Sequence, residues 1–388
     1  MSDSEKLAAV PPKKRRRIRR IVLFAFTVFL VCAGILLFVF REELTSDNMR
    51  RWFKYLNVKD DGSYGVFAFD SHNSNAYAAL GDGLAVASVG GVDTFDEYGR
   101  EVSTSRAGMY LPVIESAEQV ALTYDVGGTV LIVTHEEDGE LLRIEDNQTI
   151  LDADLAGDGS FCYSSSSGGY KSILTVYDSQ QKLLYRWLSS TMYLPTCAVS
   201  SGADRLAAIA LNQVDGQYRS QLYLFRTDSE QIDQIVDLSE QLIYDLYFVN
   251  QTTICSIGEN AAYFLDTDGR LLGTYSYGDT YLKDFSDEGN GFLTLSLNKY
   301  KAGNRYSVIT VDPAGREIAS VYIGQEILDL SVCDEYVAIL TTDQLFVFDK
   351  QLNLYYETQQ IGTATSVVMR EDGTVLLLGS GQGELYIP

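Results

Sequence analysis

The sequence is poor in the residues that most often carry enzyme chemistry. Among 388 residues it has two histidines, two tryptophans and five cysteines. Both histidines, His72 and His135, fall in predicted turns, and there is no HExxH zinc motif, no phosphate-binding P-loop and no GxGxxG turn. These absences argue against the common metalloprotease, nucleotide-hydrolase and dinucleotide-dependent classes. We expect no catalytic residues, no cofactor and no metal site.

Basic residues are also scarce. The chain has 30 Lys and Arg against 53 Asp and Glu, a formal net charge of −23. The first 20 residues hold eight of the basic residues and only two acidic ones, so the remainder is more acidic than the whole. A strongly negative surface repels nucleic acid. We therefore expect no nucleic-acid partner.

Two short patterns come close to functional motifs without completing them. Gly379-Ser380-Gly381-Gln382-Gly383 approaches a nucleophile elbow, but its serine is one place early. Asp152, Asp154 and Asp158 are spaced like a loose calcium loop, yet the glycine and distal glutamate of an EF-hand are absent, which favours a solvated turn. Outside the N-terminal region the cysteines lie far apart in apolar runs without a CxxC pair, so buried free thiols are expected at Cys162, Cys197, Cys255 and Cys333.

The longest hydrophobic run predicts a membrane anchor. Residues 1–20 form a basic tail, and the twenty residues from Ile21 to Phe40 carry no charge. A helix of this length spans about 30 Å, the thickness of the hydrocarbon core of a bilayer. The run is longer than that of a cleaved signal peptide, and no small-residue cleavage site follows it. The basic flank predicts a cytoplasmic N-terminus and an extracytoplasmic remainder.

Residues 41–62 predict a juxtamembrane helix and linker. Met49, Trp52, Phe53 and Leu56 recur at helical spacing. Aromatic and basic residues together suit the lipid headgroup layer, so Arg50, Arg51, Trp52, Phe53 and Lys54 are the expected membrane-interface residues. A helix packed under the following domain is the open alternative.

Residues 63–388 read as one domain built from a repeated all-β unit. The clearest repeated piece is an apolar residue followed by Asp-x-x-Gly-basic, as in Asp96 to Arg100, Asp266 to Arg270 and Asp312 to Arg316. Asp can bond its own turn and Gly supplies a positive φ, so each copy predicts a hairpin between the last two strands of a four-stranded unit. Such units match the blades of a β-propeller, which run to about 40–50 residues.

Alignment on this hairpin predicts an eight-bladed propeller, with a seven-bladed ring as the alternative. The units start near Ala76, Tyr110, Thr149, Tyr193, Leu242, Tyr281, Glu326 and Ala364. The last unit has only three strands. Residues 66–70 look like an outer strand and would complete it, which closes the ring and removes exposed sheet edges.

These patterns resemble known propellers of the quinoprotein-like and WD40-like kind. Several stretches further resemble an uncharacterised family of membrane-anchored propellers from clostridial-type Gram-positive bacteria, over nearly the whole chain: residues 45–52, Gly83-Leu84-Ala85-Val86-Ala87-Ser88, and Gly169-Tyr170-Lys171 leading to Val176-Tyr177-Asp178. The resemblance implies the fold and its topology. It implies no catalytic residues, and the propeller has neither the recurring tryptophans nor the adjacent cysteine pair of quinoprotein enzymes.

Tyrosine and basic residues recur where the second and third strands of three blades are joined. These junctions are predicted to be long loops on one face, in blade three, blade four and blade six. The candidate binding residues are Tyr170, Lys171, Tyr218, Arg219, Lys299, Tyr300, Lys301, Arg305 and Tyr306. The alternative is that these residues have no binding role, because long hairpin tips are commonly polar.

Together these patterns predict a membrane-tethered extracytoplasmic propeller that binds a protein or cell-envelope partner and is not an enzyme. The alternative is an extracytoplasmic hydrolase or lyase that uses carboxylates. A cluster of carboxyl groups with raised pKa around the ring centre would favour that alternative.

Overall fold

The computed structural model describes residues 54–56, 65–70, 72, 74–145, 147–214, 216–238 and 242–387. The chain divides into two compact units, residues 1–58 and 59–388. In the first unit only Lys54, Tyr55 and Leu56 are described, as a single helical turn.

The predicted membrane anchor falls outside this description. Within the described residues, no helix is both long and apolar enough to cross a bilayer. The basic tail, the run from Ile21 to Phe40 and the interface residues Arg50, Arg51, Trp52 and Phe53 all lie outside the described residues. The anchor and its orientation therefore stay predictions.

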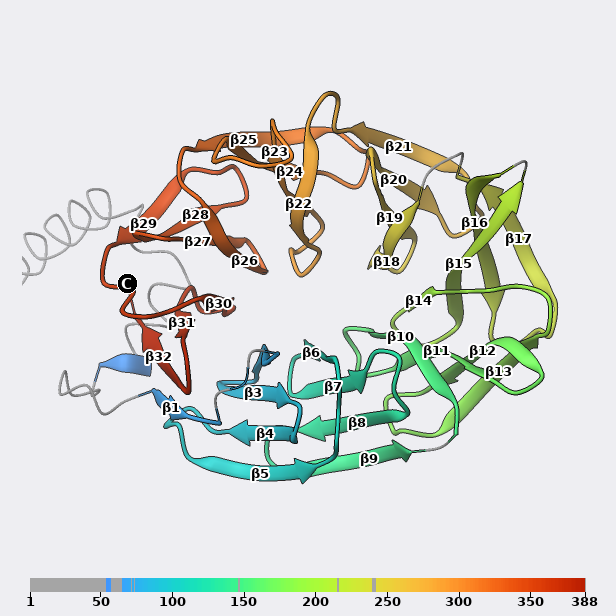
Figure 1. Ribbon diagram of the computed structural model, residues 1–388, viewed down its shortest axis with the longest axis horizontal. Coiled ribbons are helices and arrows are strands. Elements are labelled where there is room, and N and C mark those ends of the chain that lie inside the picture. The colour runs from blue at the N-terminus through green and yellow to red at the C-terminus, as the bar shows by residue number, and fades with distance from the viewer. Residues whose placement is uncertain are drawn as a thin grey trace, which may run out of the picture. The chain divides into compact units, whose positions relative to one another are not determined.

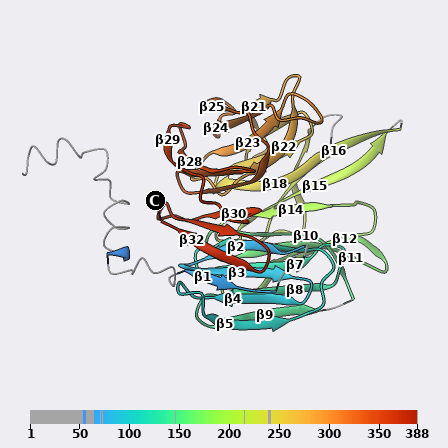
Figure 2. The same ribbon diagram turned by 60° about the vertical axis from the view of Figure 1, so that its left-hand side comes forward.

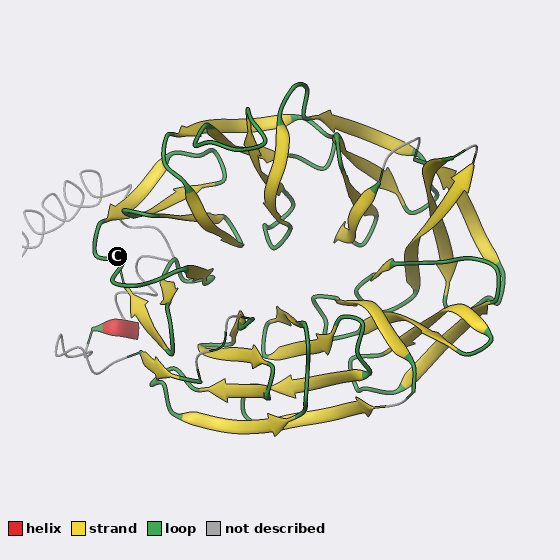
Figure 3. Ribbon diagram, viewed as in Figure 1, coloured by secondary structure: helices red, strands yellow, loops and turns green. Residues whose placement is uncertain are grey.

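The second unit is an eight-bladed β-propeller (Figures 1 and 3). Its strands form eight four-stranded antiparallel sheets. Eight was the predicted number, and the seven-bladed alternative is wrong.

The first four blades follow the chain without interruption. Blade one is β2 (Ala76–Leu80), β3 (Gly83–Ser88), β4 (Gly91–Phe95) and β5 (Glu101–Arg106). Blade two is β6 (Pro112–Ala117), β7 (Val120–Asp125), β8 (Val130–His135) and β9 (Gly139–Glu145). Blade three is β10 (Thr149–Leu155), β11 (Phe161–Ser167), β12 (Tyr170–Tyr177) and β13 (Leu183–Ser189). Blade four is β14 (Thr196–Val199), β15 (Arg205–Val214), β16 (Gln217–Arg226) and β17 (Ile232–Asp237).

The remaining blades complete the ring. Blade five is β18 (Ile243–Asn250), β19 (Thr253–Gly258), β20 (Ala261–Asp266) and β21 (Leu271–Ser276). Blade six is β22 (Tyr281–Ser286), β23 (Leu293–Asn298), β24 (Tyr306–Val311) and β25 (Glu317–Ile323). Blade seven is β26 (Ile327–Cys333), β27 (Tyr336–Thr341), β28 (Leu345–Asp349) and β29 (Leu354–Thr358). Blade eight is β30 (Ser366–Met369), β31 (Val375–Leu378), β32 (Gln382–Tyr386) and β1 (Val66–Ala68).

The blades pack face to face, which explains their sequence pattern. The second strand of a blade is covered on both sides, so β3, β19, β23 and β27 are buried at every position. The fourth strand lies at the outer edge and alternates, as β21 and β25 do. Continuous apolar runs are therefore the second strands, and alternating runs are the outer ones.

The recurrent Asp-x-x-Gly-basic turn is formed as predicted. Asp96 Oδ1 accepts hydrogen bonds from the backbone N–H groups of Tyr98 and Arg100, at 2.9 and 3.0 Å. A related turn from Asp178 to Lys182, which lacks the glycine, makes the same two bonds to the aspartate. There Gln181 takes the positive φ of 57°, which a non-glycine residue adopts only under constraint. The aspartate therefore defines this turn more strictly than the glycine does.

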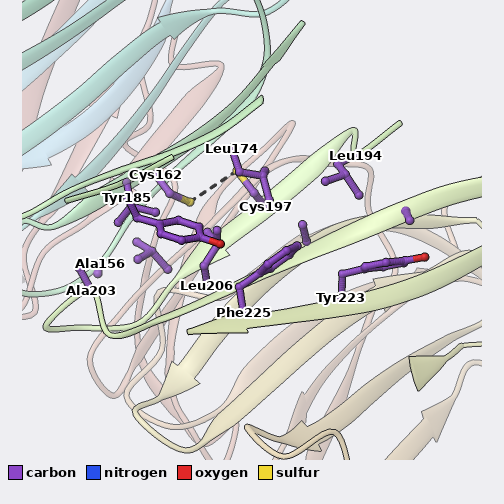
Figure 4. Close-up of a cluster of buried hydrophobic side chains, with 14 residues drawn as sticks. Ala156, Cys162, Leu174, Tyr185, Leu194, Cys197, Ala203, Leu206, Tyr223 and Phe225 are labelled. Atoms are coloured by element: carbon purple, nitrogen blue, oxygen red, sulfur yellow. Dashed lines mark hydrogen bonds between the residues drawn. The ribbon is translucent and has the colours of Figure 1, made fainter. Parts of the chain in front are cut away.

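Three of the four cysteines in the propeller are buried thiols, as expected, and the fourth is less buried than expected. Cys162, Cys197 and Cys255 are free and buried, and Cys333 is free and half-buried. Cys162 on β11 and Cys197 on β14 lie far apart in sequence, yet their sulfur atoms are 3.5 Å apart in the core between blades three and four (Figure 4). Burial raises the pKa of Cys197 to about 11, which keeps this thiol neutral at physiological pH.

The antiparallel order gives the propeller two distinct faces. One face carries the connections between blades and the turns between second and third strands, and we call it the upper face. The lower face carries the turns from first to second and from third to fourth strands. Since β1 is the fourth strand of blade eight and runs antiparallel to β32, the chain enters the propeller at the lower face.

The N-terminal strand closes the ring as predicted. In β1, Val66, Phe67 and Ala68 pair with Glu384, Gly383 and Gln382 of β32. The Phe67 side chain is fully buried, while Val66 beside it is 40% exposed. Strand β1 therefore both pairs the edge of β32 and fills the core between blades eight and one.

We predict that Phe67→Ala lowers the free energy of unfolding by about 3–5 kcal/mol, because it leaves a cavity at a fully buried aromatic position. Val66→Ala in the same strand is the control and should change it by less than about 0.5 kcal/mol. Deletion of residues 63–71 should expose β32 and cause aggregation. Chemical denaturation of the three proteins checks this, and equal stability of Phe67→Ala and Val66→Ala would contradict it.

Candidate functional site

Two sets of residues stand out in the propeller. One is a group of tyrosines and cations on the upper face. The other is a group of carboxylates on the innermost strands.

The predicted binding residues lie on the upper face. Tyr170 and Lys171 begin β12, Tyr218 and Arg219 stand near the start of β16, and Tyr306 begins β24. Lys299, Tyr300, Lys301 and Arg305 belong to the turn between β23 and β24. All of these are junctions of second and third strands, so the topology places them on one face.

The shape of these junctions differs from the prediction in two blades. Residues 164–169 and 212–220 were expected to be long loops. Instead β11 continues to Ser167, and β15 and β16 pair out to Val214 and Gln217. In Figure 2 the hairpin of β15 and β16 extends beyond the neighbouring blades. Only the junction in blade six is a long loop, because Ser167 pairs with Tyr170 in blade three and Val214 pairs with Gln217 in blade four.

Exposed tyrosines are concentrated on the upper face. Nine tyrosines are exposed among the described residues. One of them, Tyr98, lies in a lower-face turn. The other eight stand on upper-face junctions or at the upper ends of strands: Tyr110, Tyr170, Tyr193, Tyr218, Tyr244, Tyr281, Tyr300 and Tyr322. Only Tyr170, Tyr218 and Tyr300 of these eight were predicted from the sequence to be binding residues.

A signal for the missed tyrosines was present in the sequence. Tyr110 and Tyr193 sit in the matching stretches Met109-Tyr110-Leu111-Pro112 and Met192-Tyr193-Leu194-Pro195, which join one blade to the next. Connections between blades emerge on the same face as the junctions of second and third strands. Tyr110 is 87% exposed, the highest value among the exposed apolar and aromatic side chains of the described residues.

Negative charge is concentrated on the lower face. Its turns carry the acidic runs Glu136-Glu137-Asp138, Asp287-Glu288, Asp334-Glu335 and Glu371-Asp372. Six cations on this face form ion pairs: Arg100–Asp96, Arg205–Asp233, Arg226–Asp228, Arg270–Asp266, Arg316–Asp312 and Lys350–Glu335. The two faces therefore differ in both aromatic content and charge.

The second set is a carboxylate girdle, the side chains of Glu115, Asp152, Asp154, Asp245, Asp284, Asp287, Glu288 and Asp329. Six of them lie on the first strands of blades, and Asp287 and Glu288 follow β22 directly. First strands such as β6, β10, β18, β22 and β26 lie nearest the centre of the ring (Figure 1). The girdle was not predicted from the sequence. The prediction that Asp152 and Asp154 lie in a solvated turn is wrong, because both residues lie within β10.

Four members of the girdle occupy the same position in their blades. Asp152, Asp245, Asp284 and Asp329 each follow an apolar residue by two places, as in Ile150-Leu151-Asp152 and Ile327-Leu328-Asp329. At each of them the pairing with the second strand shifts register just before the aspartate. Such a bulge re-aims a side chain, and Asp152 and Asp329 accept hydrogen bonds from the next blade. The repeat of apolar-x-Asp at the predicted unit starts was the signal that could have revealed it.

Several carboxylates of the girdle bridge neighbouring blades. Asp152 Oδ2 accepts hydrogen bonds from the backbone N–H of Cys197 at 2.9 Å and from Thr196 Oγ1 at 2.6 Å. Asp154 Oδ2 accepts from the N–H of Val199 at 2.7 Å. These bonds join the first strands of blades three and four.

The same bridge recurs at two more junctions. Glu115 Oε2 accepts a hydrogen bond from the N–H of Leu155 at 2.9 Å, which joins blade two to blade three. Asp329 Oδ2 accepts from the N–H of Val367 at 2.8 Å, and Ser331 Oγ accepts from the N–H of Met369 at 2.9 Å. Backbone donors of one blade are thus satisfied by carboxylates of the preceding one.

The girdle carboxyl groups resist ionisation. Burial, reinforced by the charge of Asp329, raises the pKa of Asp284 to about 6. Burial also raises the pKa of Asp329 to about 6, against the hydrogen bonds that lower it. For Glu288 the surrounding protein and the neighbouring charge of Asp287 raise the pKa to about 8, although its side chain still reaches solvent. Carboxyl groups with raised pKa values therefore do cluster around the centre of the ring, which is the feature that favours a carboxylate enzyme.

Within the described residues, no group of three or more His, Cys, Asp or Glu side chains is arranged to hold a metal ion. Four of the eight girdle carboxylates are already engaged with backbone donors of the next blade: Glu115, Asp152, Asp154 and Asp329. The arrangement suits structural bridging and proton uptake.

We predict opposite effects for two matched substitutions in the girdle. Asp284 and Asp329 share the motif position and a pKa of about 6, but only Asp329 is seen to accept a bond from the next blade. At pH 8, Asp284→Asn should stabilise the protein by on the order of 1 kcal/mol because it removes a charge that is costly to keep ionised. Asp329→Asn should destabilise it by about 1–3 kcal/mol because the cross-blade acceptor is impaired.

The pH dependence follows from the same pKa values. A carboxyl group with a raised folded-state pKa binds more protons in the folded than in the unfolded state, so stability falls as pH rises from about 4 to about 6. This fall should be smaller in Asp284→Asn than in the wild type. Denaturation curves at pH 4, 6 and 8 check it, and identical pH profiles for Asp284→Asn and wild type would refute the assignment.

Comparisons with known structures agree with the fold. The C-terminal WD40 domain of Sif2 matches with a TM-score of 0.58 and 12% identity, over 83% of this chain and 97% of that one. A eukaryotic initiation factor matches with a TM-score of 0.52 and 10% identity, over 81% and 90%. BamB from Moraxella catarrhalis matches with a TM-score of 0.48 and 13% identity, over 82% and 97%. At these identities the first two matches support the fold alone and nothing about function.

Comparison with curated proteins gives no match. A protein-family model, described as a family of unknown function (DUF5711), matches residues 63–381. The match covers nearly the whole propeller and confirms the predicted resemblance as far as the propeller is concerned, whereas the clostridial source and the membrane anchor stay predictions. The chain belongs to the DUF5711 family.

Proposed function

We propose that this protein is a non-enzymatic binding module, a propeller whose upper face holds a protein partner. The observation that carries the proposal is the gathering of eight of the nine exposed tyrosines on that face. Tyrosine supplies a large contact area at low conformational cost and is enriched at binding hot spots. The acidic lower face has no comparable set of exposed aromatic residues among those described.

We further propose that the propeller is tethered to the membrane and faces the outside of the cell. The support is the uncharged run from Ile21 to Phe40 with its basic flank. Within the propeller, strand β1 begins at the lower face, opposite the tyrosine-bearing face.

One experiment tests both parts. The full chain is kept in the membrane of intact, wall-free cells and treated with a membrane-impermeant cross-linker. We predict a defined adduct with one partner protein, with the cross-linked positions on the upper face. Tyr110→Ser combined with Tyr193→Ser and Tyr218→Ser should reduce the adduct about tenfold.

The matched control removes exposed apolar residues from the starts of outer strands, near the lower face. Leu183→Ser, Leu271→Ser and Leu354→Ser change side chains that are 49–55% exposed. They should leave the adduct within about twofold of wild type. A chain that the external reagent cannot reach contradicts the tether, and an adduct lost only in the control contradicts the upper-face site.

A carboxylate enzyme remains the second candidate, because the girdle supplies a suitable pair. With a pKa of about 8, Glu288 is largely protonated at neutral pH and could act as a general acid, with Asp287 beside it. This candidate predicts that the wild type cleaves some member of a panel of glycosides and uronic-acid polysaccharides. Glu288→Gln should slow that reaction at least about 100-fold. A wild type that turns over no member of the panel contradicts it.

A further inference from the structure

The cations of blade six are unlike most of those on the lower face. Lys283 lies on β22, and Lys299, Lys301 and Arg305 lie in or beside the turn between β23 and β24. All four are exposed. Within the described part of the chain none of them forms an ion pair, whereas Arg100, Arg270 and Arg316 on the lower face are each held by the aspartate of their own turn.

These four cations are organised into one patch. Lys283 Nζ donates a hydrogen bond to the backbone oxygen of Lys301 at 2.7 Å. The Lys301 ammonium in turn stands 5.5 Å from the centre of the Tyr281 ring. The backbone N–H of Lys299 donates to the oxygen of Arg305, which closes the turn that carries them. We call Lys283, Lys299, Lys301 and Arg305, with the flanking Tyr281 and Tyr300, the blade-six patch.

The charge of this patch is available to a partner. In a chain of net charge −23, four adjacent cations without a carboxylate partner are uncompensated. On the lower face the same sequence supplies an aspartate next to nearly every arginine in a turn. The blade-six patch lacks this neutralisation, and its lysine stems and tyrosine rings give an apolar surface beside the charges.

We propose that the blade-six patch binds an acidic polypeptide segment of the partner protein. This inference rests on the proposed binding function of the upper face and names the chemistry of its charged contact. Carboxylates of the segment pair with Lys299, Lys301 and Arg305. Its backbone and side chains lie against Tyr281 and Tyr300.

The surroundings favour a short peptide over an extended polyanion. Glu259 lies in the upper-face turn of blade five, Asp279 in the connection to blade six, and Asp343 in the upper-face turn of blade seven. A bilayer of anionic lipid or a long phosphate polymer would meet these carboxylates as well as the patch. A short segment stays within about one Debye length of the four cations, where their attraction dominates.

The test uses the full chain in detergent and a fluorescent ten-residue peptide of Asp and Glu as the probe, with the matching Asn and Gln peptide as the uncharged reference. We expect the acidic peptide to bind at low salt and the uncharged one not to bind. Lys299→Ala with Lys301→Ala should weaken binding about tenfold. Neither side chain is needed for the fold, because Lys301 serves the local structure through its backbone oxygen.

The control makes the same change of net charge on the other face. Arg100→Ala with Arg316→Ala removes two arginines that are held by Asp96 and Asp312. Binding should stay within about twofold of wild type. Equal weakening in both pairs of variants would mean that only net charge matters and would overturn the patch.

Two further arms separate other polyanions from the peptide. Vesicles rich in anionic lipid and inorganic polyphosphate are tested against the same proteins. Stronger binding to either than to the peptide, lost in Lys299→Ala with Lys301→Ala, would overturn the choice of an acidic peptide. A cross-linked partner that survives the lysine substitutions but not the tyrosine ones would leave the proposed function standing and refute this inference alone.

Discussion

Face-to-face packing of sheets around a ring is the constraint on which this structure depends. Each blade buries both of its faces against neighbours, so no blade has a core of its own. The side chains of β3, β19, β23 and β27 are buried at every position because they stand between two other sheets. A ring of this kind tolerates no gap, which is why β1 from the start of the chain has to complete the sheet formed by its end.

Local signals in the sequence were enough to predict the fold. The turns at Asp96 and Asp312 can be recognised from residues only four places apart in the sequence, because the aspartate accepts hydrogen bonds from backbone groups within the same turn. Once those turns are aligned, the blade starts, the number of blades and the missing strand of blade eight follow. The hairpins of blades three and four were taken for loops because polar residues there hid the two-residue turns.

The carboxylate girdle could not be predicted in the same way. Asp152 accepts its bonds from Thr196 and Cys197, more than 40 positions along the chain. The packing of two blades against each other determines which backbone N–H group faces Asp152. A single sequence contains no direct sign of that packing. Four copies of apolar-x-Asp at matching places were visible, but their role depends on the bulges that aim the aspartates at the next blade. The exposed tyrosines of the upper face were predicted only in part for a similar reason, since Tyr244 and Tyr322 join them through topology rather than through any shared motif.

The carboxylate girdle and the upper-face tyrosines support different functions. Their contacts in the structure indicate which function is better supported. Raised pKa values in a cluster of carboxyl groups are a common mark of a catalytic site. Here the best-bonded members of the girdle hold backbone donors of the next blade, and those bonds would be lost if the carboxylates took up a substrate. Asp245, Asp284, Asp287 and Glu288 are seen in no such bridge, so any catalytic role would fall to them. The tyrosines and lysines of the upper face have no comparable structural task. Exposed tyrosine rings without a structural task form a surface that a partner protein can cover, which is why the proposed function rests on them.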